Sequence, residues 1–102
     1  MAGVALAFSE LSIGTRLWTA EPEGFDDHAR SLKSGKHERN PTSAGSICDA
    51  LLSPEPGELT FAINQGRLSG GVAVSETQVR HAMRFAFEVL KLVIEPGGAV
   101  AL

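Results

Sequence analysis

The chain has 102 residues, of which 43% are hydrophobic and 21% charged, a composition typical of one small globular domain. Nine basic residues against twelve acidic ones give a formal net charge of -3. This charge argues against a nucleic-acid partner, because such a surface needs a concentrated basic stripe. The basic residues between positions 30 and 39 are diluted by Glu38 and have no aromatic among them, so we interpret them as a solvated helix end and loop.

The chain shows no sign of a membrane span or of secretion. Cys48 is its single cysteine, so no disulfide can form within the chain, and this fits a reducing compartment. No apolar run reaches the ~18–20 residues of a membrane span. The opening MAGVALAF lacks a basic n-region and a cleavage site. We therefore expect a soluble, cytoplasmic protein.

Both ends of the chain are apolar. It begins directly in a helical pattern without a cap, and it stops at GGAVAL inside another apolar pattern. Domains usually begin and end on exposed polar segments. We therefore expect residues 1–102 to be an incomplete portion of one domain, with uncovered apolar faces that favour association.

The first predicted element is a helix over residues 2–12 with one buried face. Its apolar side chains recur at i, i+3, i+4 and i+7: Val4, Ala7, Phe8 and Leu11. A turn at residues 12–15 follows, and the β-forming segment 16–20 predicts a short strand that Pro22 ends. A helix, a short turn and a strand resemble the second half of a βαβ unit, which indicates an α/β fold.

The middle of the chain alternates short elements with loops. We predict a helix at 25–34, a loop at 36–45, a helical turn at 46–52, a helix at 58–68 and a strand at 71–74. Asp26 and Asp27 suit the first turn of the earliest of these helices, because carboxylates complement its macrodipole, and Gly35 suits its end.

The best-defined element is a helix that follows Ser75 and runs to Ile94. Ser75 and Gln78 form a capping box at its start. Its apolar residues form one wide stripe: Val79, Ala82, Met83, Ala86, Phe87, Leu90, Val93 and Ile94. Glu95-Pro96 ends this helix, and the glycines that follow begin another over residues 99–102.

Clustered carboxylates follow the first strand in the stretch TAEPEGFDD, residues 19–27. Glu21 stands at the carboxyl end of the strand, where α/β proteins usually bind ligands. Together with Asp27 it could bind magnesium or calcium, which prefer oxygen ligands. The alternative is an acidic helix N-terminus without an ion. Spacing alone favours this alternative, because the D-x-D-x-D-G pattern of an EF-hand is absent.

The sequence gives little support for a catalytic nucleophile, a catalytic histidine or a phosphate-binding loop. There is no G-x-S-x-G nucleophile motif. We expect all three histidines at the surface: His28, His37 and His81. Cys48 has no basic neighbour that would lower its pKa, so we expect a buried, unreactive thiol. The glycine pair at 70–71 precedes a strand, and the pair at 97–98 follows Glu95, which would repel an anion.

Four ordered segments nevertheless resemble the pyridoxal-phosphate-dependent threonine/serine dehydratases of fold type II, whose relatives include serine racemases and hydroxyaspartate ammonia-lyases. MAGVALA at residues 1–7 matches the segment just after that family's glycine-rich phosphate loop. A-E-P at 20–22 precedes a D-D pair, SICDA at 46–50 is similar to T-I-A-D-G, and KLVIEPGGA at 91–99 is similar to K-L-x-x-E-P-x-G-A. The resemblance covers the whole chain and implies part of a three-layer, parallel-sheet α/β fold.

The resemblance also implies a cation site. In racemases and hydroxyaspartate lyases of this family, a divalent cation is held by the Glu of A-E-P, a backbone carbonyl four residues on and an Asp six residues on. These positions are Glu21, Phe25 and Asp27 in this chain. The implied ion is magnesium or calcium.

The resemblance assigns pyridoxal phosphate as the cofactor of the parent enzyme. Ala50 replaces the glycine of A-D-G beside the cofactor, and Glu95 lies where the family carries a Glu near the cofactor ring. Capping of the next helix is an alternative role for Glu95. Ser53 lies where some relatives place a substrate-facing serine.

The catalytic groups themselves are expected outside this chain. In the family the Schiff-base lysine and glycine loop come earlier, and the residue that meets the pyridine nitrogen comes later. Lys33, Lys36 and Lys91 lie in other sequence contexts. The resemblance therefore implies the C-terminal portion of a catalytic domain, inactive alone, without a catalytic residue of its own.

The resemblance also implies the reaction and the assembly of the parent enzyme. The parent would be a homodimeric lyase that converts a small amino acid to a 2-oxo acid and ammonia. Its substrate would be L-threonine, L-serine or a 3-hydroxyaspartate. The alternative is a free-standing cation-binding or dimerising module derived from that enzyme.

Overall fold

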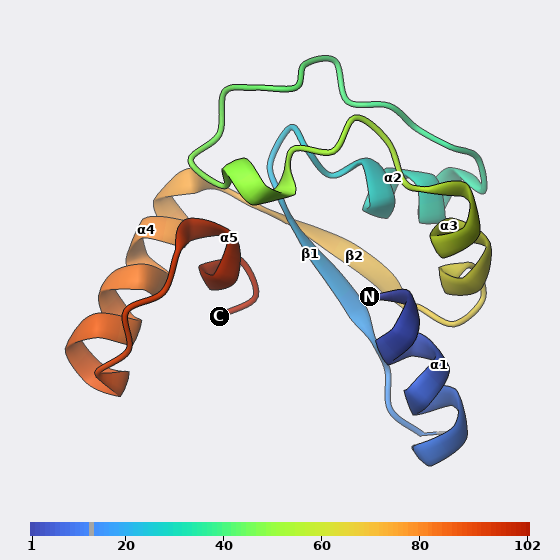
Figure 1. Cartoon of the computed structure of the whole chain (residues 1–102), viewed down its shortest axis with the longest axis horizontal. Coiled ribbons are helices and arrows are strands. Elements are labelled where there is room, and N and C mark those ends of the chain that lie inside the picture. Colours follow the sequence, from blue (N-terminus) through green and yellow to red (C-terminus); the bar gives the residue numbers. More distant parts are fainter. Residues whose placement is uncertain (13) are drawn as a thin grey trace.

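A pair of parallel strands forms the centre of the computed structural model, which describes residues 1–12 and 14–102. Strands β1 (Trp18–Pro22) and β2 (Gly70–Val74) pair in register, from Trp18 opposite Gly70 to Pro22 opposite Val74. In the view of Figure 1, α4 and α5 lie to the left of the strands, and α2 and α3 lie to the right. The expected α/β fold with a parallel sheet is confirmed, and helices cover both sides of the strands.

Helix α1 (Ala2–Leu11) forms as predicted, but the prediction of which residues it buries within this chain is wrong. Ala5 is the buried residue, and it lies off the predicted stripe. Val4, Phe8 and Leu11 are exposed, and the exposed fraction of Leu11 reaches 85%. The expectation of an uncovered apolar face is therefore confirmed for this helix, whereas Ala99 and Val100 at the other end of the chain are buried and contradict it there. The predicted turn after α1 includes Ile13, which lies outside the described residues.

The strand bounds differ from the prediction because pairing between the strands sets them. Strand β1 begins two residues later than expected and includes Pro22, while β2 begins one residue earlier. Pro22 has no N–H to donate to a sheet, but its carbonyl accepts a bond from Phe25 N at 2.9 Å. The chain therefore turns sharply where β1 ends.

Helix α2 (Asp27–Ser34) packs closely over the strands. A Cβ placed on Gly71 would lie 2.6 Å from Ala29 Cβ and 3.0 Å from Ala29 Cα, and it would collide with Thr19 Oγ1. The helix starts two residues later than predicted and ends at Gly35, which has the expected left-handed conformation with φ 72°. The missing side chain of Gly71 is what lets α2 lie this close to β2.

The segment between α2 and β2 contains a short helical turn and a helix. The predicted turn at 46–52 is a 3-10 turn, η1 (Asp49–Leu51). Helix α3 (Glu58–Asn64) is shorter than predicted and is followed by Gly66, whose φ is 80°. A left-handed glycine is a common way to end a helix, so the sequence contained the signal for this earlier end.

Helix α4 (Glu76–Phe85) begins with the predicted capping box, in which Gln78 N donates to Ser75 Oγ at 3.4 Å and Ser75 N donates to Gln78 Oε1 at 2.9 Å. The predicted continuation to Ile94 is wrong. The helix widens into a π turn, η2 (Ala86–Leu90), and Lys91 then takes a left-handed conformation with φ 60°. Leu92 N donates back to Ala86 O at 2.9 Å, which closes the helix end.

The core lies between the strands, α4 and α5 (Pro96–Ala99). Its buried members are Cys48, Val79, Ala99 and Val100, and Ala20 and Val74 pack against them from the strands. The expected burial of Cys48 is confirmed. Over the described residues, no helix is both long and apolar enough to cross a bilayer.

Candidate functional site

A cavity of about 390 Å³ lies at the carboxyl end of β1. Residues from β1, the start of α2, η1 and the start of α3 line it. Four predicted site residues are among them: Glu21, Asp27, Ala50 and Ser53. Phe25 and Glu95 do not line it. The structure thus brings together residues that are up to 32 positions apart in the sequence, counted from Glu21 to Ser53.

The Glu21 carboxylate caps the N-terminus of α2. Its Oε1 accepts a bond from His28 N at 3.0 Å, and its Oε2 accepts one from Ala29 N at 2.8 Å. Thr19 Oγ1 adds a longer bond at 3.3 Å. These bonds satisfy amides at the first turn of the helix, which have no partner within it. The cap explains why α2 begins at Asp27 and not earlier.

The surroundings of Glu21 shift the pKa of its carboxyl in opposite directions. Burial raises the pKa of the Glu21 carboxyl above its ordinary value, and the negative charge of Asp27 raises it further. The amides of Ala29 and His28 act in the opposite direction. A divalent ion bound beside Glu21 would favour the charged form of its carboxyl.

Asp27 is almost fully buried, with 5% of its surface exposed. Its Oδ1 accepts a bond from Asn40 Nδ2 at 2.6 Å. No described residue donates to its Oδ2, so this oxygen keeps its lone pairs for another ligand. Within residues 1–12 and 14–102, no group of three His, Cys, Asp or Glu side chains gathers, and the predicted site needs two carboxylates and one carbonyl.

Phe25 contributes to the predicted site through its backbone. Its side chain is buried, and its N–H donates to Pro22 O at 2.9 Å. Among the described residues, none donates a hydrogen bond to the Phe25 carbonyl oxygen. The donor set of Glu21, Asp27 and this carbonyl has the oxygen chemistry that magnesium and calcium prefer. Coordination by Phe25 stays a prediction.

Ala50 and Glu95 lie close to each other around Gly97. A Cβ placed on Gly97 would lie 3.6 Å from Ala50 Cβ and 3.8 Å from Glu95 Oε1. Glu95 occupies the N-cap position of α5, but its side chain makes no capping bond. Its backbone carbonyl accepts from Ala99 N at 3.1 Å. The side chain of Glu95 is therefore not held by its own helix.

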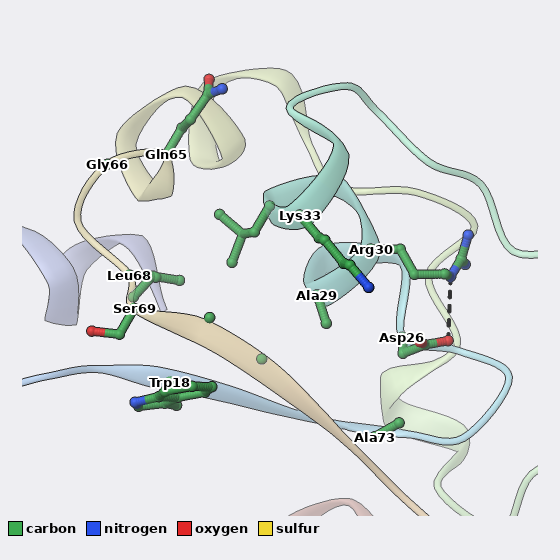
Figure 2. A pocket seen from close by; sticks show the side chains of 13 residues that line it. Trp18, Asp26, Ala29, Arg30, Lys33, Gln65, Gly66, Leu68, Ser69 and Ala73 are labelled. Atoms are coloured by element: carbon green, nitrogen blue, oxygen red, sulfur yellow. Dashed lines mark hydrogen bonds and ion pairs between the residues drawn. The ribbon is translucent and has the colours of Figure 1, made fainter.

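Over residues 1–12 and 14–102, no lysine or arginine lines the cavity that holds Glu21. Lys33 and Arg30 line a second cavity, of about 500 Å³. None of the predicted site residues lines this second cavity. Figure 2 shows Lys33 and the Arg30–Asp26 ion pair on the α2 side of this second cavity, with Trp18 at the strands. The larger cavity thus lies apart from the predicted site. Among the described residues that line the smaller one, none carries a lysine side chain.

His28 is not the surface residue that the sequence suggested. It is half-buried, its Nε2 lies 3.0 Å from Asn64 Nδ2, and its ring meets Phe61 edge-on at 6.0 Å. Burial lowers the pKa of the His28 imidazole, while the charge of Asp27 raises it. Asn64 and Phe61 lie more than 30 positions away, so local sequence could not reveal these contacts.

The lowered pKa of His28 predicts a pH dependence of stability. The folded state favours the neutral ring. The contribution of His28 to the free energy of unfolding is therefore present above the ordinary pKa of 6.5 and is lost as pH falls through the lowered folded pKa. We expect the free energy of unfolding to decline less between pH 7 and pH 5 in His28→Gln than in the wild type. Urea unfolding at several pH values measures this, and parallel profiles would contradict it.

The capping role of Glu21 predicts a loss of stability even without a cation. Glu21→Ala leaves the amides of His28 and Ala29 without their partner, and loss of a cap costs about 1–2 kcal/mol. Glu23→Ala is the matched control, because Glu23 is exposed in the same acidic stretch. Urea unfolding in the presence of a chelator compares Glu21→Ala with Glu23→Ala. Equal unfolding midpoints for the two variants would show that Glu21 does not act as a cap.

Comparisons with known proteins agree with the family resemblance. The family model described as "Pyridoxal-phosphate dependent enzyme" matches residues 1–102. Serine racemase from Dictyostelium discoideum is 34% identical over 103 residues, which cover 100% of this chain and 32% of the racemase. L-threo-3-hydroxyaspartate ammonia-lyase from Pseudomonas sp is 32% identical over 102 residues, which cover 100% of this chain and 32% of that protein.

The fold is also similar to that of solved structures. The crystal structure of threonine deaminase from T.th. matches with a TM-score of 0.92 and 37% identity, covering 97% of this chain and 33% of the deaminase. The chain therefore spans about a third of the length of these relatives. The structural match extends the predicted fold type II architecture over nearly the whole chain.

Proposed function

Because the chain belongs to the family of pyridoxal-phosphate-dependent enzymes, we propose that it is the C-terminal portion of a catalytic domain in a hydroxy-amino-acid lyase. The parent enzyme dehydrates and deaminates L-threonine, L-serine or a 3-hydroxyaspartate to a 2-oxo acid and ammonia. The relatives named as threonine deaminase and hydroxyaspartate ammonia-lyase support this reaction class. The observation that carries the proposal is the cavity shared by Glu21, Asp27, Ala50 and Ser53.

The residues of this chain form one side of the proposed active site. When bound, pyridoxal phosphate supplies an electron sink for charge that develops at the substrate Cα. Ala50 and Glu95 would contact the cofactor, and Ser53 would face the substrate. Among the residues that the structure describes, no lysine lines the cavity. The base at Cα would come from another part of the parent enzyme. This chain positions and encloses the reactants and transfers no proton itself.

Glu21, Asp27 and the Phe25 carbonyl are the proposed ligands of magnesium or calcium. Support comes from the shared cavity, the charge of Asp27 that raises the pKa of Glu21, and the unbonded Phe25 carbonyl. Glu21 already joins the end of β1 to the first turn of α2. The ion would strengthen this junction and so hold the cavity in one shape.

The proposed parent is a cytoplasmic homodimer that acts on a small amino acid and does not bind nucleic acid or a membrane. The exposed apolar residues of α1 and η2 support a larger assembly, since uncovered patches of this kind mark contact surfaces. They equally favour the second candidate, a free-standing cation-binding or dimerising module. Sedimentation of the chain with and without magnesium separates the two, because only the module predicts a discrete, cation-dependent dimer.

The proposed reaction predicts that the isolated chain is inactive. On addition of pyridoxal phosphate we expect the absorbance of the free cofactor to remain unchanged, because no lysine lines the cavity among the described residues. We also expect no 2-oxo acid from L-threonine or L-serine. Absorbance titration and a coupled assay for 2-oxo acids measure both, and a stable new band with turnover of L-threonine would contradict the proposal.

A further inference from the structure

Asn40 joins the predicted cation site to the loop that carries Ser53. One side-chain atom, Nδ2, donates to Asp27 Oδ1 at 2.6 Å and to the Ser53 carbonyl at 2.7 Å. The backbone N–H of Asn40 donates to Pro54 O at 2.8 Å. Asn40 lies 13 residues from both Asp27 and Ser53, in a segment that sequence patterns identify only as loop. It therefore bridges two parts of the cavity wall.

Arg30 fixes the orientation of the Asn40 amide. Its Nη2 donates to Asn40 Oδ1 at 2.6 Å, so the amide oxygen faces the guanidinium and the NH₂ group faces Asp27 and Ser53. Arg30 is itself held by Asp26 at 3.3 Å and by the Arg39 carbonyl at 3.2 Å. A guanidinium has no acceptor, so the opposite orientation of the amide would set donors against donors.

The bonds of Asn40 leave one Asp27 oxygen for another ligand. Oδ1 accepts from Asn40, and no described residue donates to Oδ2. An ion bound to Asp27 would restrict the carboxylate, and a fixed carboxylate would restrict the Asn40 amide that it accepts from. Because the same Nδ2 also holds the Ser53 carbonyl, that restriction reaches the loop with Ala50 and Ser53.

We propose that Asn40 is a positioning residue that couples cation binding at Glu21 and Asp27 to the order of the segment at residues 49–56. The inference rests on the cation site of the proposed function. It adds a direction of regulation, in which the ion orders the cofactor and substrate wall through one amide. Coupling is reciprocal, so a ligand that orders the segment also tightens cation binding.

Hydrogen exchange on the 102-residue chain, with and without magnesium chloride, tests the coupling. In the wild type we expect magnesium to slow amide exchange in residues 49–56 by about fivefold or more, the range of typical site-to-site coupling. In Asn40→Ala the cation still binds, as calorimetry measures, but this magnesium-dependent slowing is lost. Thr42→Ala, in the same loop, is the control and keeps the slowing, because the Thr42 side chain donates to the Ala44 carbonyl and to no other residue that the structure describes.

A second variant guards against simple unfolding. Asn40→Leu keeps the approximate size of the side chain and adds no charge, but it has no donor for Asp27 or Ser53 and no acceptor for Arg30. We expect it to lose the magnesium-dependent slowing as well. If magnesium binds and both variants keep the slowing, the role of Asn40 is overturned while the cation site stands. If magnesium gives no heat with the wild type, the cation site itself is wrong and the coupling with it.

Discussion

Gly71→Ala is expected to lower the free energy of unfolding by about 3 kcal/mol, the upper part of the usual range for overpacking a tight site. A Cβ at this position would lie 2.6 Å from Ala29 Cβ and 3.0 Å from Ala29 Cα. Neither neighbour is the flexible end of a long side chain, so α2 as a whole must move away from the strands. Urea unfolding followed by circular dichroism measures the change.

Gly3→Ala is the matched control for this prediction. Gly3 lies in α1, and a Cβ there would meet nothing within 4 Å. Alanine has the higher helix propensity, so we expect this substitution to stabilise the chain by at most about 1 kcal/mol. If the two substitutions change stability alike, the close approach of α2 to β2 at Gly71 is incorrect.

Asp27→Ala is expected to abolish the stabilisation of the chain by magnesium or calcium. A ligand that binds only the folded state adds about 2.7 kcal/mol at a free concentration 100 times its Kd, and this gain should disappear with one of two carboxylate ligands. Asp27 is buried at the cavity and leaves Oδ2 without a protein donor among the described residues. Titration calorimetry and cation-dependent thermal unfolding measure the loss.

Glu23→Ala controls for the general effect of removing an acidic group. Glu23 belongs to the same acidic stretch but is exposed and does not line the cavity. It should keep the wild-type heat of cation binding. Equal heats from the wild type and Asp27→Ala would exclude Asp27 as a ligand, and equal losses from Asp27→Ala and Glu23→Ala would indicate non-specific attraction.

Elements specified by neighbouring residues were predictable, and their ends were less so. The capping box of Ser75 and Gln78 is local, and the structure confirms it. The end of that helix was missed because Lys91 takes the left-handed conformation that glycine usually provides. The bounds of β1 depend on its pairing with β2, which begins 52 positions later, from Trp18 to Gly70. No local pattern contains that information.

The site was only partly visible in the sequence. The order of four motifs led to Glu21, Asp27, Ala50 and Ser53, and the structure places these residues around one cavity. The sequence did not reveal that Glu21 caps α2, because a turn brings the amides of His28 and Ala29 to the Glu21 carboxylate. Asn40 was missed because asparagine is common in polar loops and its partners lie far away in the sequence.

The most direct test of the proposed function is a chimera with the threonine deaminase from T.th., in which residues 1–102 replace the corresponding third of that enzyme. The account predicts that the chimera folds, binds pyridoxal phosphate and releases a 2-oxo acid from L-threonine, L-serine or a 3-hydroxyaspartate. A folded, cofactor-loaded chimera that forms no 2-oxo acid from any of these substrates, beside an active unaltered deaminase, would contradict it.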